Sequence, residues 1–259
     1  RGERVGLIGH YAAADADAAS RLLDAACRHL ASVGCTIAIG PMDGSTWRRY
    51  RLLTERGSEP TFFLEPDNPD DWPRHFERAG FEPMAQYYSA LCDDLAAIAS
   101  ADARAQALRA DGFTLRPIEL ARIDAELFTL WTLATDAFAG NFLYTPISRD
   151  EFCAMYKAVL PVLRPELVLI AERAERAGRA VGFGFAVPDV LQAQRGKPID
   201  TVVFKTLAVA SDMGQRGIGK WIFDETLRAA RSLGLRRAIF ALIHEDNPSG
   251  RLAHPHGRD

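Results

Sequence analysis

Glycines and cations are concentrated in one short stretch, Met213–Trp221, which reads "MGQRGIGKW". It follows an apolar run, "TVVFKTLAVAS", and precedes a helix-like segment, "WIFDETLRAARSLG". A helix start offers free N–H groups and the positive end of its dipole, and glycines let phosphate oxygens approach the backbone. The stretch therefore predicts a phosphate-binding loop. The residues that we expect to contact phosphate are Gly214, Gln215, Arg216, Gly217, Ile218, Gly219 and Lys220.

Two other glycine motifs fit this loop less well. From Gly214 the spacing is that of a P-loop ending at Lys220, but Trp221 stands where Ser or Thr would bind magnesium. The dinucleotide fingerprint needs its glycines in the reverse order and a preceding βαβ unit. A helix that merely begins with a glycine-rich loop is the remaining structural alternative.

The elements that must position the loop follow from the apolar spacing. "FTLRPIEL" predicts a strand, "RIDAELFTLWTLATDAF" an amphipathic helix, and "GNFLYTPISRDEFCAMYKAVL" a loop and second helix. "ELVLIAERAERAGRAVGFGFAV" predicts a hairpin that turns near Gly178, and "TVVFKTLAVA" the next strand. With the helix and strand after the loop, the order is β-α-α-β-β-β-α-β.

This order and the loop together resemble the GNAT superfamily of N-acetyltransferases. The acyl-CoA loop of that superfamily reads Gln/Arg-x-x-Gly-x-Gly/Ala, and Gly217 and Gly219 match its small positions. Gly214 departs from the pattern, because it stands at the first position, where Gln or Arg is usual. Gln215 and Arg216, which follow it, are residues of those two types. "HEDNPS" resembles the Asn-bearing stretch that lines the cofactor, which implies a role for Asn247. The resemblance implies an α/β fold, namely the acyl-CoA N-acyltransferase (GNAT) fold, with a mixed, mostly antiparallel sheet flanked by helices.

The resemblance also implies the chemistry. An acetyl group would pass from acetyl-CoA, the acyl donor, to a primary amine by direct attack, without a metal. Backbone N–H groups of Leu207, Ala208 and Val209 would serve the thioester carbonyl and pantetheine. The acceptor would be a small-molecule or protein amine. A non-catalytic acyl-CoA-binding or protein-interaction module is the alternative function.

No general base stands out, because the strand 201–210 contains no Asp, Glu or His. His244 and Glu245 close the last strand and are candidates, although a histidine there is more often simply hydrogen-bonded at the surface. Tyr144 is a third catalytic candidate. It lies with Phe142 in the loop between the first two helices, where an acceptor pocket would form, but both residues also suit a core.

The chain is similar to itself at a shift of 200 residues. "LLDAACRHLASVGCTIAI" from Leu22 aligns without a gap with "IFDETLRAARSLGLRRAI" from Ile222. We therefore expect two related α/β units: a partial GNAT-like unit at 1–95, a helical linker at 96–111 and an acetyltransferase unit at 112–259. The alternative is that any two amphipathic helices followed by strands look alike.

The first unit is not expected to bind CoA. At this shift the loop glycines Gly214, Gly217 and Gly219 align with Ala14, Asp17 and Ala19, and the carboxylates of Asp15 and Asp17 would repel phosphate. Such acids instead favour an ordinary helix start.

The last strand of the second unit would leave an uncovered sheet edge, which invites aggregation. Two segments of the first unit, "EPTFFLEP" and "EPMAQYYSA", are candidates to cover it. A homodimer that exchanges strands would serve the same purpose.

Composition narrows the function classes. The 259 residues carry a formal net charge of −3, with 31 basic and 34 acidic residues, so we expect no nucleic-acid partner. No apolar run approaches the ~18 residues of a membrane span, so we expect no membrane partner.

The four cysteines are widely spaced, which favours free thiols and a cytoplasmic location over disulfides or zinc. The sequence has no charged-then-apolar leader, although it begins at Arg1 rather than methionine.

Overall fold

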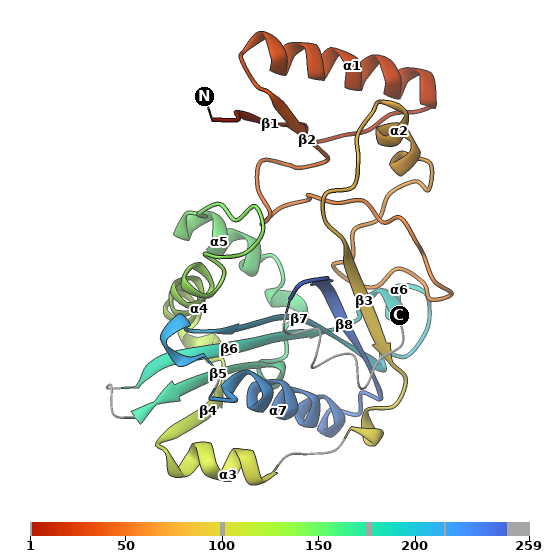
Figure 1. Cartoon of the computed structure of the whole chain (residues 1–259). Helices are drawn as coiled ribbons and strands as arrows, with labels where there is room; N and C mark the ends of the chain where they lie inside the picture. Colours follow the sequence, from red (N-terminus) through yellow and green to blue (C-terminus); the bar gives the residue numbers. More distant parts are fainter. Residues whose placement is uncertain (1, 99–101, 175–177, 215, 248–259) are drawn as a thin grey trace. The chain divides into compact units, whose positions relative to one another are not determined.

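The computed structural model describes residues 2–98, 102–174, 178–214 and 216–247 (Figure 1). The chain divides into two compact units. The first comprises Arg1–Ala85 with Asn141–Thr145, and the second comprises Gln86–Gly140 with Pro146–Asp259. The division comes before residues 86–95, which we had expected in the first unit.

The second unit contains the strands and helices that the sequence predicted from residue 112 onward, in the predicted order. Its strands are β3 (Tyr87–Cys92), β4 (Phe113–Pro117), β5 (Val168–Arg173), β6 (Arg179–Pro188), β7 (Thr201–Val209) and β8 (Arg237–His244). Its helices are α3 (Asp102–Ala110), α4 (Ile123–Ala137), α5 (Arg149–Lys157), α6 (Leu191–Gln194) and α7 (Ile218–Ser232). Short 3-10 turns include Leu95–Ala97 and Ser211–Met213.

Six strands form one sheet in the order β3-β8-β7-β6-β5-β4. Only the pair of β7 and β8 is parallel, and the other neighbours are antiparallel. The sheet is therefore mixed and mostly antiparallel, as predicted. β3 comes from the segment "EPMAQYYSA" and pairs with β8 along its length, from Tyr87 opposite His244 to Cys92 opposite Ala238. The expected covering of the last strand is confirmed for this segment.

Helices cover both faces of this sheet (Figure 1). α7 lies so close to β6 that a Cβ at Gly184 would come within 2.6 Å of Ile222 Cγ2. The next residue, Phe185, points to the opposite face because side chains alternate along a strand. There its ring contacts Tyr156 of α5 at a centroid distance of 5.0 Å. Glycine in β6 thus allows α7 to pack closely, while α4 and α5 cover the other face.

The first unit has a smaller β-α-β core. β1 (Val5–Leu7) and β2 (Ile37–Ile39) are parallel and are joined by α1 (Ala16–Ser32); a second helix, α2, spans Trp72–Arg78. Asp15 caps α1 by accepting a hydrogen bond from Ala18 N–H at 2.7 Å. The acids at this point thus serve a helix start, as predicted.

Both units place a parallel strand, a helix and a second strand in the same order. α1 ends at Ser32 and α7 at Ser232, and Gly34 and Gly234 follow with φ of 85° and 84°. Both glycines therefore adopt the left-handed conformation that commonly ends a helix. A common origin of the two units stays a prediction.

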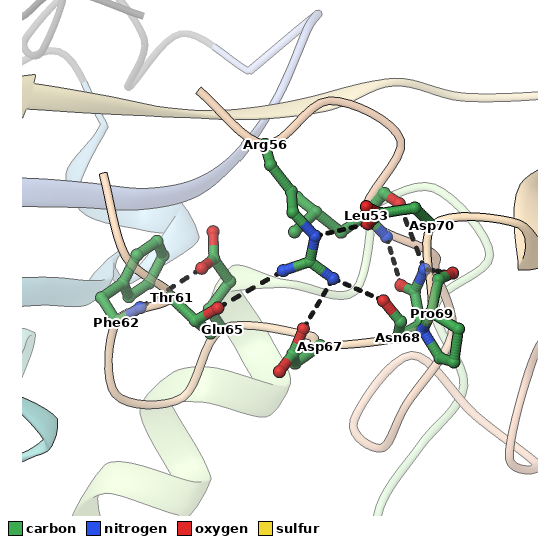
Figure 2. A network of polar contacts seen from close by, with 9 residues as sticks. All are labelled: Leu53, Arg56, Thr61, Phe62, Glu65, Asp67, Asn68, Pro69 and Asp70. Atoms are coloured by element: carbon green, nitrogen blue, oxygen red, sulfur yellow. Dashed lines mark hydrogen bonds and ion pairs between the residues drawn. The ribbon is translucent and has the colours of Figure 1, made fainter. Parts of the chain in front are cut away.

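The segment between β2 and α2 is a long loop without strands, so the strand expected from "EPTFFLEP" is wrong. Arg56 organises this loop through one guanidinium (Figure 2). Its Nε donates to Asp70 Oδ1 at 2.6 Å, its Nη2 pairs with Asp67 Oδ1 at 2.7 Å, and its Nη1 reaches Thr61. The Asn68 side chain bonds Leu53 N–H and C=O. Side chains thus supply polar partners that a sheet would otherwise have provided.

Candidate functional site

The predicted phosphate loop lies between β7 and α7 in the second unit. Gly217 is the residue before α7 and adopts the left-handed conformation, with φ 82° and ψ 9°. Trp221 N–H bonds back to Gly217 C=O at 3.1 Å. The helix start therefore leaves the N–H groups of Ile218, Gly219 and Lys220 for a ligand. Gln215 lies outside the described residues.

Glycine is also suited to the first turn of α7. A Cβ at Gly219 would lie 3.5 Å from Val209 Cγ2 and 3.6 Å from Leu207 Cδ2, which are ordinary contact distances. A small side chain would therefore fit there, and the turn lies directly against the end of β7. The start of α7 and the end of β7 are thus in direct contact.

Two carboxylates fix the start of this loop. Asp136, at the end of α4, accepts hydrogen bonds from Ser211 N–H at 2.8 Å and from the Ser211 hydroxyl at 3.0 Å. Arg179, at the start of β6, donates to both carboxylate oxygens of Asp212, at 2.8 and 3.3 Å. Both acids are thereby occupied by partners, and the loop is held on two sides.

β7 and β8 stop pairing partway along their length. Their ladder runs from Thr201 opposite Arg237 to Phe204 opposite Phe240 and ends there. The residues whose backbone we expected to serve the donor, Leu207, Ala208 and Val209, lie beyond the last pair. In Figure 1 the far ends of β7 and β8 run in different directions.

A bulge marks the place where the two strands part. β6 and β7 change register between Phe185 opposite Thr206 and Ala186 opposite Phe204, so β7 has one more residue there, Lys205. On β8, Leu242 has a positive φ of 58° and its N–H bonds the Ser89 hydroxyl at 3.1 Å. Bulges bend strands and re-aim side chains, and here both strands deviate at the same level.

The two predicted cations of the loop differ in their surroundings. Arg216 is exposed. Lys220 forms an ion pair with Asp224 one turn later, and the Asp224 side chain is only 7% exposed. A phosphate at the helix start would therefore find one lysine whose charge is already partly balanced.

Trp221 confirms that the loop is not a P-loop. Its side chain is 2% exposed, and its indole N–H reaches Glu225 at 3.3 Å. No hydroxyl stands at this position to hold magnesium. Among the side chains described, no group of three or more His, Cys, Asp or Glu is arranged to hold a metal ion.

The candidate catalytic residues are divided between the two units. His244 and Glu245 follow β8 in the second unit, whereas Tyr144 belongs to the first unit and packs against Trp47 at 6.1 Å. Asp246 N–H donates to His244 Nδ1 at 3.1 Å, which leaves the proton of the neutral ring on Nε2. Glu245 accepts from Gln86 N–H at 3.1 Å and so holds the start of β3. Asn247 N–H bonds His244 C=O at 2.8 Å.

A pair of hydrogen-bonded hydroxyls at the β7 bulge was not predicted from the sequence. Thr206 hydrogen-bonds Tyr156 of α5, and burial raises the pKa of Tyr156 to about 12 despite this bond. The Tyr156 ring stacks on Phe152 at 4.4 Å. Both hydroxyls are therefore neutral at ordinary pH. No residue pattern announces this pair, since one tyrosine in an amphipathic helix is usually a core residue.

None of the helices in the described parts of the chain is long and apolar enough to cross a bilayer.

Comparison with known proteins places the fold. No family model matches the sequence. The sequence is 27% identical over 190 residues to a bacterial ceramide synthase of Caulobacter vibrioides, a match that covers 73% of this chain and 49% of that protein. The chain thus spans about half the length of this curated relative.

Solved structures give the second comparison. The GCN5-related glucosamine N-acetyltransferase region of a fungal multi-domain GH3 β-N-acetylglucosaminidase matches with a TM-score of 0.56 and 13% identity, covering 92% of this chain and 26% of that one. A GCN5-related N-acetyltransferase from Sphaerobacter thermophilus matches with a TM-score of 0.49 and 15% identity, covering 71% and 51%. The chain has the GNAT fold that the sequence predicted.

Proposed function

We propose that this chain is an acyl-CoA-dependent N-acyltransferase that moves an acetyl group from acetyl-CoA to a primary amine. One observation carries the proposal. The left-handed Gly217 opens α7 directly after β7, and the last residues of β7 lie beyond its ladder with β8. This arrangement offers N–H groups for a pyrophosphate and, next to them, strand backbone for the pantetheine and thioester.

The proposed reaction needs few side chains. The amine nitrogen attacks the thioester carbonyl carbon, a C–N bond forms and the C–S bond breaks. CoA leaves as a thiolate and takes up one proton for the one that the amine loses. Backbone N–H groups of Leu207, Ala208 and Val209 would donate to the carbonyl oxygen as negative charge develops on it. Such donors act without a metal.

The proposed reaction also moves a proton from the amine and a proton to the thiolate of CoA. His244 carries its ring proton on Nε2 in this arrangement, so it suits a donor better than a base. The strand next to the thioester carries the neutral hydroxyl of Thr206, which bonds Tyr156 of α5, instead of a carboxylate. We therefore infer that the acceptor reacts as the free amine.

The likeness to a ceramide synthase favours a second candidate acceptor. Ceramide is a fatty-acid amide of a lipid amine, so the name of that relative describes N-acylation. A long-chain acyl-CoA and a lipid amine therefore belong in the same test as acetyl-CoA and small amines.

The test is turnover with purified protein. Acetyl-CoA and palmitoyl-CoA are each incubated with small amines, a lysine peptide and a long-chain amino alcohol. Thiol release and product mass are measured. We expect amide formation with at least one pair, and none with Gly217→Asp. Tight CoA binding without any amide would instead support the non-catalytic binding module, and absence of CoA binding would exclude both readings.

A further inference from the structure

The helix α3 lies in the segment that sequence analysis treated as a linker, yet it packs on the start of α7. Arg109 of α3 pairs with Glu225 of α7 at 3.3 Å, and its guanidinium lies over the Trp221 ring at 5.6 Å. The Trp221 indole N–H reaches the same Glu225 oxygen. These contacts fasten the last turn of α3 to α7.

A second arginine of α3 lies against the left-handed glycine of the loop. A Cβ at Gly217 would come within 2.5 Å of Arg104 Nη1 and 3.3 Å of Arg104 Cδ. Glycine at 217 is therefore needed for two reasons, its φ of 82° and the approach of this guanidinium. The Arg104 side chain is exposed, and among the carboxylates described none lies within 4 Å of it.

This placement is electrostatically unfavourable for the protein alone. Cations stabilise helix C-termini and destabilise N-termini, where the dipole is positive. Arg104 is far in sequence from Arg216 and Lys220. In the structure, however, its side chain lies at the same place as theirs in the fold, the N-terminus of α7. Of these three cations, only Lys220 has an acidic partner among the described residues. An anion bound there would relieve the repulsion.

We propose that Arg104 is a further donor-binding residue, whose guanidinium contacts a phosphate group of acyl-CoA at the start of α7. This proposal rests on the proposed function and makes α3 part of the donor site. Arg is well suited to the role because its planar fork binds phosphate through two parallel hydrogen bonds. The pyrophosphate and the 3′-phosphate of CoA share this chemistry.

The test is calorimetric titration of the full chain with CoA. We expect Arg104→Ala to weaken binding about tenfold, the size of one charge-assisted contact. Arg104→Lys keeps the charge but loses the fork, so it should recover part of the affinity. The matched control is Arg231→Ala, which removes the same charge from the last turn of the same helix. It should bind CoA as the wild type does.

A second titration with dephospho-CoA, which lacks the 3′-phosphate, separates the two sources. A tenfold loss with both ligands assigns Arg104 to the pyrophosphate, and a loss with CoA alone assigns it to the 3′-phosphate. Wild-type affinity of Arg104→Ala for CoA overturns this inference and leaves the proposed function standing. A wild-type chain that binds no CoA would instead refute the proposed function and this inference together.

Discussion

Lys220 and Asp224 form an ion pair on α7, at the helix start where the phosphates of acyl-CoA are proposed to bind. The carboxylate is nearly buried, whereas the ammonium side chain is 26% exposed. A lysine that must serve a ligand is thus already bound to an acid, and donor affinity should depend on that acid.

Asp224→Asn should raise CoA affinity by about threefold. The amide keeps the shape of the carboxylate but removes the charge that competes with phosphate for Lys220, and a threefold change in affinity corresponds to about 0.7 kcal/mol. Titration calorimetry measures the change. The double variant Asp224→Asn, Lys220→Ala should lose the gain. An unchanged affinity in Asp224→Asn would show that Lys220 does not contact the donor.

Gly217→Asp should abolish CoA binding. It places a carboxylate beside the N–H groups of α7, where like charge repels phosphate, and it forces a side chain into a left-handed position against Arg104. The matched control is Asp17→Gly in the first unit, which should leave CoA binding unchanged. Retained affinity in Gly217→Asp, with thermal unfolding as a check on folding, would exclude this loop as the donor site.

Donor affinity should fall as salt concentration rises, because exposed charges are screened. Arg216→Ala combined with Lys220→Ala should reduce that dependence to the part that Arg104 contributes. Calorimetric titrations at several salt concentrations give the slope for each protein. If the double variant keeps the full slope, the phosphates are held by other cations, of which Arg104 is the first to examine.

A fragment of residues 112–259 should be insoluble or fail to bind CoA. It lacks β3, which covers β8 and contributes Ala90 and Cys92 to the core, and its loss would open a sheet edge. A fragment of residues 86–259 keeps β3 and should be soluble. Size-exclusion chromatography and CoA titration compare the two. A monomeric, CoA-binding 112–259 fragment would contradict a structural role for β3.

Asp200 should stabilise the fold at neutral pH. Burial opposes ionisation, but hydrogen bonds from Gln192, Arg236 and Thr201 prevail and lower the pKa of Asp200 below its usual 3.8. A lowered folded-state pKa gives stability that is complete above 3.8 and is lost as pH falls through the folded value. Asp200→Asn should therefore cost about 1 kcal/mol from pH 7 to 4, and less below that.

Urea unfolding across this pH range measures the difference between Asp200→Asn and wild type. The control is Asp124→Asn, which removes an exposed partner of Lys157 and should have little effect. An Asp200→Asn deficit that grows as pH falls below 4 would contradict the assignment.

The sequence predicted the elements of the second unit because their apolar periods are regular. Gly217 and Gly219 predicted a phosphate loop, and in the structure Gly217 is left-handed at the helix start, where a Cβ would come within 2.5 Å of Arg104 Nη1. β3 was predicted as a cover because the last strand would otherwise have had an open edge. Each of these inferences depended on a local sequence pattern or on the rule that an open sheet edge is usually covered.

Other parts of the site leave no such pattern. The point where β7 leaves β8 depends on the register at Lys205, and "TVVFKTLAVA" reads as one uninterrupted strand. Arg104 reaches Gly217 only through the packing of α3 on α7, and its alanine-rich surroundings indicate a helix but no partner. Likewise, residues 59–66, "EPTFFLEP", lie in a loop in which Arg56 contacts Asp67 and Asp70, and their apolar run does not indicate these contacts. Tertiary packing decides all three.

The pairing of β3 with β8 also governs the order in which the chain can fold during synthesis. Gln86 and Glu245, which meet where these strands begin and end, are 159 residues apart in sequence. β3 leaves the ribosome before the other described strands of its sheet, yet its neighbour among them, β8, is the last of these strands to be made. Contacts so distant in sequence form slowly, and unpaired strands exposed in the meantime are prone to aggregate. The sheet of the second unit therefore closes only after translation has passed β8, and β3 must wait for it as an extended segment.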